Sequence, residues 1–114
     1  MEKLSEKLGD VQVVHLRGRL DLAAAPELEA FLQQLIDAGE TKLVLDCRDL
    51  KYVSSSGLGT FIATGKRLAP SGAKLGFAAL SPHIQGLFDM SGIASLFDIY
   101  STKDDALKRL STSA

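Results

Sequence analysis

Residues 42–62, KLVLDCRDLKYVSSSGLGTFI, join two apolar segments of different periodicity. The first segment, Lys42 to Cys47, has a continuous apolar centre, which is typical of a strand covered on both faces. Beyond the serines, apolar residues recur at the spacing of one helix face. These residues are Leu58, Phe61, Ile62 and Leu68. The stretch therefore predicts a buried strand that leads into a helix, with a run of serines at the junction.

The same order of elements recurs towards the carboxyl terminus. Lys74 to Leu80 and Leu96 to Tyr100 are predicted strands, and a helix start follows each of them. Ser81-Pro82 combines an N-cap residue with proline at the first helical position, and Thr102 to Asp105 resembles a capping box. Strands that alternate with helices in this way imply parallel strands joined by right-handed crossovers.

The amino-terminal part has a different pattern. Leu4 to Leu8 and Val11 to Arg17 predict two strands, and Gly9-Asp10 between them suits a hairpin turn. Gly18 to Asp21 interrupts the second strand pattern and is expected to form a loop. The first two strands are therefore expected to pair antiparallel.

One further helix is predicted between this hairpin and the central strand. Pro26 suits its first turn and Gly39 its carboxyl end. Residues 1–114 are expected to form one α/β domain, with a mixed, mostly parallel sheet of four to five strands and about four helices packed on it. The last residues, STSA, are expected to be frayed.

Composition excludes several classes of protein. The 114 residues carry 13 basic and 14 acidic side chains, and a nucleic-acid binder would usually be markedly basic. The polar start MEKLSEKLGD is not a signal peptide, and no apolar run approaches the roughly 18 residues of a membrane span. The single cysteine, Cys47, fits a reducing compartment. We expect a soluble, cytoplasmic protein without a membrane span or direct contact with nucleic acid.

The serines at the junction raise the possibility of a serine hydrolase, which needs a base. The only histidines are His15, in a predicted strand, and His83, in the first turn of a predicted helix. The nucleophile-elbow pattern requires glycine two residues before the serine, and Val53 stands there relative to Ser55. Hydrolysis therefore requires that His15 or His83 lie within hydrogen-bond reach of Ser55.

Other catalytic and metal motifs are also incomplete. Gly57 and Gly59 have the first spacing of a dinucleotide fingerprint, but Ile62 stands where the third glycine belongs. One cysteine and two separated histidines do not make a metal site. We expect the histidines to be structural or exposed and Cys47 to be a small core residue.

Three acids lie near the expected loops. Asp21, Asp46 and Asp49 lack a second group that would define an acid–base reaction. Their simplest interpretation is as solvated acids at loop ends, with partner contact as the alternative.

The serine run itself has two explanations. A helix start has unsatisfied N–H groups and the positive end of the helix dipole, and a serine cap there is worth about 1 kcal/mol. A cap needs one serine, whereas this stretch has three serines and two glycines. The same helix start would favour a phosphate, which would add about −1.5 to −2 charges to a neutral surface. The residues leave a cap and a phosphorylation switch equally open.

Taken together, these motifs resemble those of a known family, the STAS-domain proteins of the anti-sigma factor antagonist kind. The resemblance covers nearly the whole chain and rests on motifs that occur in order and at family spacing. Similar to family motifs are Gly18-Arg19-Leu20-Asp21 (G-x-L-D), Leu43-Val44-Leu45-Asp46 (central strand), Tyr52-Val53-Ser54-Ser55-Ser56-Gly57-Leu58-Gly59 (D-S-S/T-G-L-G), and Ser81-Pro82 through Leu87-Phe88-Asp89-Met90-Ser91-Gly92 (S-P-x-v-x-x-L-F-x-x-x-G).

The resemblance implies a function in partner switching. In the family, an anti-sigma factor that is also a serine kinase phosphorylates the serine that corresponds to Ser55. The unphosphorylated antagonist binds the anti-sigma factor and thereby frees a sigma factor, and a PP2C-type phosphatase resets the switch. The chain would be a substrate and a ligand, not an enzyme, and would need no cofactor because the kinase supplies ATP and magnesium.

The resemblance also implies which residues contact the partner. With Ser55 as the phosphorylated residue, the expected contacts are Asp21, Ser54, Ser55, Ser56, Gly57, Leu58 and Gly59. In one respect this sequence departs from the family, because Ser54 stands where the family commonly has an acid. That acid could orient the hydroxyl or the docked kinase.

A second function remains open beside the switch. The chain would then be a constitutive STAS subunit of a stressosome-like or lipid-transport complex, and the serines would only cap the helix. In that case replacing Ser55 by alanine is expected to lower stability by about 1 kcal/mol and leave partner binding intact.

Overall fold

The computed structural model describes residues 1–110, and the expectation for the STSA tail lies outside this range. The sheet has five strands in the order β1-β2-β3-β4-β5. They are β1 (Glu2–Leu8), β2 (Val11–Leu20), β3 (Lys42–Val53), β4 (Lys74–Ala78) and β5 (Asp98–Tyr100). β1 pairs antiparallel with β2, and every other neighbouring pair is parallel. The mixed, mostly parallel sheet is therefore confirmed.

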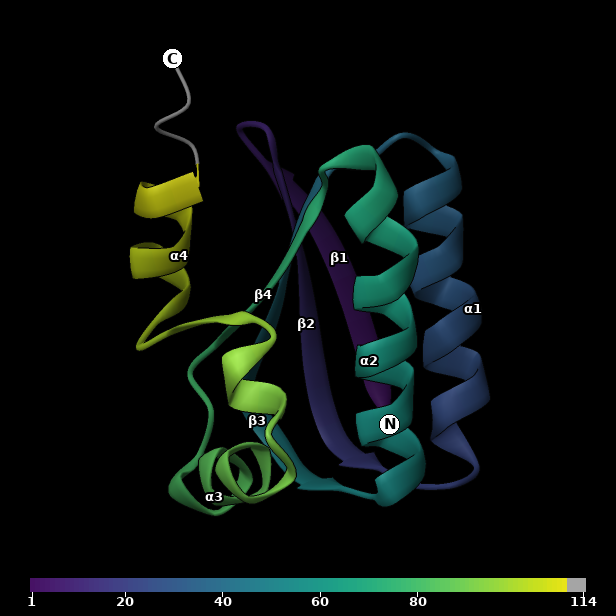
Figure 1. The fold of residues 1–114 in the computed structure, drawn as a ribbon, viewed down its shortest axis with the longest axis vertical. Helices are drawn as coiled ribbons and strands as arrows, with labels where there is room; N and C mark the ends of the chain where they lie inside the picture. Colours follow the sequence, from purple (N-terminus) through teal and green to yellow (C-terminus); the bar gives the residue numbers. More distant parts are fainter. Residues whose placement is uncertain (111–114) are drawn as a thin grey trace.

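Helices cover both faces of this sheet (Figure 1). They are α1 (Ala24–Asp37), α2 (Ser55–Leu68), α3 (Pro82–Ser91) and α4 (Lys103–Leu110), with short 3-10 turns at Ala69–Ser71 and Ile93–Ser95. α1 and α2 lie side by side and begin at the same end of the sheet, where β2 and β3 finish. The loops after β2 and β3 are therefore neighbours.

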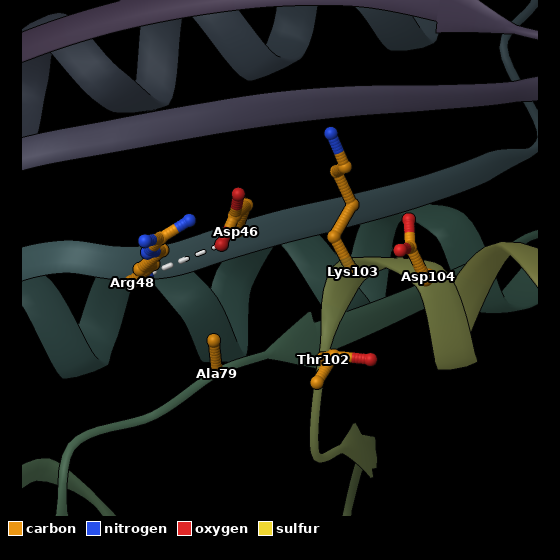
Figure 2. A pocket seen from close by; sticks show the side chains of 6 residues that line it. All are labelled: Asp46, Arg48, Ala79, Thr102, Lys103 and Asp104. Carbon is orange, nitrogen blue, oxygen red and sulfur yellow. Dashed lines mark hydrogen bonds between the residues drawn. The ribbon is translucent and has the colours of Figure 1, made fainter.

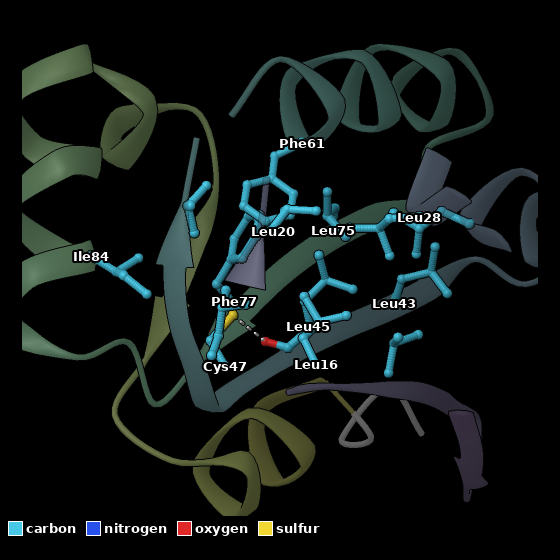
Figure 3. Close-up of a cluster of buried hydrophobic side chains, with 14 of the residues drawn as sticks. Leu16, Leu20, Leu28, Leu43, Leu45, Cys47, Phe61, Leu75, Phe77 and Ile84 are labelled. Atoms are coloured by element: carbon cyan, nitrogen blue, oxygen red, sulfur yellow. Dashed lines mark hydrogen bonds between the residues drawn. The ribbon is translucent and has the colours of Figure 1, made fainter. Parts of the chain in front are cut away.

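Two apolar clusters hold the layers together. The larger cluster lies between the sheet and α1, α2 and α3, and Figure 3 shows Phe61, Phe77 and Leu20 within it. Phe77 packs edge-on against Phe61 and Phe88, with ring centroids 4.9 and 5.0 Å apart. The smaller cluster packs α4 against the opposite face of β2, β3 and β4. The apolar centre of β3 is thus covered on both faces, as its sequence predicts.

Cys47 lies in the larger cluster and is fully buried. Burial raises the pKa of its thiol, and the neighbouring Asp46 carboxylate raises it further. The thiol therefore stays protonated and packs as a small apolar side chain, which confirms the expectation for this residue.

The expected loop at Gly18 to Asp21 is wrong, because β2 continues through Gly18 to Leu20. Gly18 has a φ of +99°, and the pairing with β3 shifts register on both sides of it. β3 is also longer than its apolar centre, so Arg19 and Leu20 still find partners in Tyr52 and Val53. The interruption in the sequence pattern therefore lies within β2 and does not end it, and at both register shifts the extra residue belongs to β3.

Candidate functional site

The serine segment forms the start of α2, directly after the last residue of β3. Ser54 is the N-cap, and its Oγ accepts a hydrogen bond from the Gly57 N–H at 3.1 Å. The Ser54 N–H donates to the Leu20 carbonyl at 2.8 Å, which ties the cap to the end of β2. The structure therefore assigns the cap to Ser54 and not to Ser55.

Ser55 is the first residue of α2, and its side chain is exposed. Within residues 1–110, no hydrogen bond engages the Ser55 hydroxyl. The first turn of α2 contains no acidic residue. An accessible hydroxyl thus stands at the positive end of a helix dipole that no nearby acid on the helix compensates.

The two glycines of the segment have different surroundings. Gly57 is buried, and a Cβ there would lie 2.7 Å from Cγ of Leu20 and 3.0 Å from Cγ1 of Val53. Gly59 is exposed, and a Cβ there would have no neighbouring atom within 4 Å. Gly57 therefore lets α2 lie against the ends of β2 and β3, whereas the fold places no such demand on Gly59.

The remaining two residues of the segment connect it to the rest of α2. Ser56 is half-buried, and its carbonyl accepts a hydrogen bond from the Thr60 hydroxyl at 3.2 Å. Leu58 is half-buried and packs against the larger apolar cluster. Of the segment's side chains, that of Ser55 is exposed, while those of Ser54, Ser56 and Leu58 are only partly accessible.

The loop between β2 and α1 brings two further residues to this end of the molecule. Asp21 Oδ1 accepts a hydrogen bond from the Ala24 N–H at 3.0 Å, so this acid holds the start of α1. Leu22 beside it is 74% exposed. Sequence reasoning missed Leu22, although an apolar residue between Asp21 and the helix start is a signal that could have found it.

A shallow groove of about 260 Å³ lies between the first turns of α1 and α2. Its lining residues are Leu22, Ala25, Pro26, Glu29, Ser56, Gly59 and Thr60. The structure thus brings together the serine segment and the loop around Asp21, which are more than thirty residues apart in sequence.

The two histidines lie elsewhere in the fold. His15 is in β2, with Nδ1 2.9 Å from Asp46 Oδ2 and Nε2 2.5 Å from Glu6 Oε2. Both ring nitrogens thus contact carboxylates, and neither contacts a serine. His83 is exposed, at the start of α3. These positions agree with the expectation of structural or exposed histidines, and no contact in the described residues supports a hydrolase.

The interpretation of Asp46 as a solvated acid at a loop end is wrong. Asp46 lies within β3, is only 8% exposed, and accepts hydrogen bonds from His15 and from the Arg48 N–H. Asp49 is also within β3 and not at a loop end, because the strand runs six residues past Cys47, but it is exposed, as expected of a solvated acid. The polar residues after the apolar centre continue a strand that pairs with the extended end of β2.

A second depression, of about 490 Å³, lies near the start of α4 (Figure 2). Its lining residues are Asp46, Arg48, Ala79, Thr102, Lys103 and Asp104. In Figure 2, Arg48 and Lys103 flank Asp46, so the depression has charges of both signs. It shares no residue with the serine segment. Residues 1–110 contain no cluster of three or more metal-ligating side chains and no helix long and apolar enough to cross a membrane.

Comparison with protein families gives a match over nearly the whole chain. The model for the STAS domain matches residues 3–106. BtrV of Bordetella bronchiseptica, which has the provisional name of an anti-sigma factor antagonist, is 31% identical over 98% of this chain and 97% of its own length. The anti-sigma-B factor antagonist of Bacillus subtilis is 31% identical over 87% of this chain and 89% of its own length.

A solved structure gives the same result for the fold. The crystal structure of an anti-sigma factor antagonist from Mycobacterium paratuberculosis superimposes with a TM-score of 0.88 and 29% identity. The match covers 95% of this chain and 92% of that one. The fold described above is therefore shared with a solved protein of this name.

Proposed function

The chain belongs to the STAS domain family, and we propose that it is an anti-sigma factor antagonist that phosphorylation of Ser55 switches off. In the unphosphorylated state it binds an anti-sigma factor that is also a serine kinase, and a sigma factor is released. The names of the relatives support the first part of this proposal. The accessibility of Ser55 supports the second.

The main observation in support of the switch is that the neighbouring serines Ser54 and Ser55 have different roles. Ser54 is the N-cap, so the Ser55 hydroxyl is not needed to stabilise the helix start. It is exposed, as a hydroxyl that enters a kinase active site must be. Ser55 is therefore the residue in this segment whose modification costs the fold least.

The reaction proposed at Ser55 is phosphoryl transfer from the ATP of the kinase. The Ser55 Oγ–phosphorus bond forms, the bond to the ADP leaving group breaks, and the hydroxyl proton passes to a base of the kinase. A PP2C-type phosphatase then hydrolyses the phosphoserine. The chain itself supplies no catalytic group and needs no cofactor. We place this cycle in the cytoplasm.

The charge of a phosphate on Ser55 explains why phosphorylation would weaken partner binding. The surface around Ser55 has neutral neighbours in the first turn of α2, and a phosphate would add about −1.5 to −2 charges there. The helix N-terminus would stabilise that charge on the antagonist, so α2 is not expected to unfold. A partner that packs against this surface would instead have to bury the phosphate, and binding would weaken.

Ser54 in place of the family's usual acid is compatible with this proposal. Both serine and aspartate are good N-cap residues, because each has a side-chain oxygen that accepts the N–H of the third helical residue. Ser54 makes that bond, to Gly57. The position therefore keeps its structural role without the negative charge.

The phosphorylation test uses the cognate anti-sigma factor kinase with ATP and magnesium. Mass spectrometry of the wild-type chain is expected to show one phosphate on Ser55, and Ser55→Ala is expected to remain unmodified. Ser56→Ala is the matched control and should still be phosphorylated. Phosphate on another residue, with Ser55 unmodified, would overturn the assignment.

The binding test compares wild type with Ser55→Glu by calorimetry with the same kinase. We expect an affinity loss of about 100-fold, equivalent to about 3 kcal/mol. Ser101→Glu adds the same charge at an exposed serine outside the segment and should bind as wild type does. Equal affinities for wild type and Ser55→Glu would instead favour the constitutive STAS subunit of a stressosome-like or lipid-transport complex.

A further inference from the structure

We propose that the groove between the first turns of α1 and α2 receives an apolar side chain of the anti-sigma factor, and that Leu22 is its main contact on this chain. This inference rests on the proposed function and specifies the chemistry of its interface. The groove adjoins the serine segment, because Ser56 and Gly59 line it. A partner that covers Ser55 would therefore reach the groove in the same contact.

Leu22 has the properties of a contact residue. It is 74% exposed, and it lies in the loop that leads into α1. A single exposed leucine is ordinary. Leu22 differs because it borders a groove whose floor includes the buried residues Ala25 and Thr60. An apolar rim above a floor of small residues can accept a side chain from outside.

The charge of the lining residues selects an apolar occupant. Within residues 1–110, Glu29 is the only ionisable residue that lines the groove, and its Oε1 is 2.6 Å from Nη2 of Arg67. With this carboxylate paired, no ionised side chain that lines the groove among residues 1–110 is left without a partner. An uncharged side chain would lose the least hydration free energy on entering the groove.

The size of the groove favours a protein side chain over a small molecule. Its volume of about 260 Å³ lies below the range of roughly 300–1,000 Å³ found for small-molecule sites. The groove is also shallow and open, so it could not enclose most of a free ligand. A side chain held by a larger interface does not need such enclosure.

Gly59 provides a way to fill the groove without disturbing the fold. A Cβ at Gly59 would meet no atom of the described residues within 4 Å, and Gly59 lines the groove. Alanine there should therefore strengthen the helix, because alanine has a higher helix propensity than glycine. If the partner uses the groove, the same methyl group should weaken binding.

Gly86 is a matched control for Gly59. Each is the fifth residue of its helix, α3 and α2 respectively, and a Cβ at Gly86 would also meet no atom within 4 Å. Gly86 does not line the groove. Gly59→Ala and Gly86→Ala should therefore raise the melting temperature alike and differ only in binding.

The experiment measures the affinity of the purified anti-sigma factor kinase for the unphosphorylated variants. We expect Leu22→Ala and Gly59→Ala each to weaken binding about tenfold, and Gly86→Ala to bind as wild type does.

Two other outcomes would overturn the inference, and they can be told apart. If Leu22→Ala and Gly59→Ala bind within twofold of wild type while Ser55→Glu is impaired, the groove is outside the interface and the proposed function stands. If wild type itself fails to bind any anti-sigma factor, the proposed function fails and the inference fails with it.

Discussion

The starts of α2 and α3 have the same cap and differ in the residues directly after it. In each, a serine in extended conformation precedes the helix, and its Oγ accepts the N–H of the third helical residue, at 3.1 Å for Ser54 and 3.3 Å for Ser81. The third residue, Gly57 or Ile84, is buried in both. The helix start itself therefore requires one serine.

The difference lies in the first two helical positions. α3 has Pro82 and His83 there, and proline is favoured at a first position because its missing N–H would be unpaired anyway. α2 has Ser55 and Ser56, which contribute nothing to the cap. The extra hydroxyls of α2 are therefore not explained by helix formation, and Ser55 is the exposed one.

The largest loss of stability is predicted for a substitution at the third helical position of α2. In Gly57→Ala, the new Cβ would lie 2.7 Å from Cγ of Leu20, a fully buried side chain. Overpacking of this kind costs about 1–3 kcal/mol, and the better helix propensity of alanine offsets part of it. We expect a net loss of about 1–2 kcal/mol in urea unfolding. Unchanged stability would show that α2 can move away from β2 at little cost.

Removal of the N-cap side chain is predicted to lower stability by a smaller amount, which should be equal for α2 and α3. Ser54→Ala and Ser81→Ala should each lower the free energy of unfolding by about 1 kcal/mol, since each leaves a helix N–H without its acceptor. Ser54→Asp keeps a capping oxygen and should have at least wild-type stability. Ser55→Ala should have almost no effect, and a loss of about 1 kcal/mol from that variant would contradict the assignment of the cap to Ser54.

The smallest predicted effect has the opposite sign. Ser55→Asp places a negative charge in the first turn of α2, which has no acid of its own. Interaction with the helix dipole should stabilise the chain by about 0.3–1 kcal/mol at low salt, and less at high salt. The same charge at position 83 of α3, in His83→Asp, should act similarly. Thermal unfolding at two salt concentrations measures both effects. If Ser55→Asp destabilised the chain, the fold would not be expected to accommodate a phosphate on Ser55.

Much of the fold could be predicted because the governing rules act over a few residues. Three local features illustrate this: the N-cap at Ser81, the hydrogen bond from the Asp105 N–H to the Thr102 hydroxyl, and the turn at Gly9-Asp10. Each depends on neighbours within four positions. The burial of β3 on both faces followed from its unbroken apolar centre. Apolar periodicity likewise placed the stripe of α2 correctly against the sheet.

The errors arose where a distant strand controlled the outcome. Whether β2 ends at Gly18 or continues through it depends on β3 running alongside to accept further pairing. Whether Asp46 is solvated depends on His15, which is 31 residues away in sequence. Neither contact leaves a local signal in the sequence.

For the candidate site, the amino-acid sequence was enough to define the segment, its place at a helix start and the family signature around Ser55. The role of each residue within the segment emerged only from the packing of distant elements. Leu20, from the end of β2, makes glycine necessary at position 57, and the approach of α1 to α2 forms the groove that Leu22 and Gly59 share. This division arises because capping is a bond within one turn of chain, whereas close packing and surface shape depend on which distant segments meet.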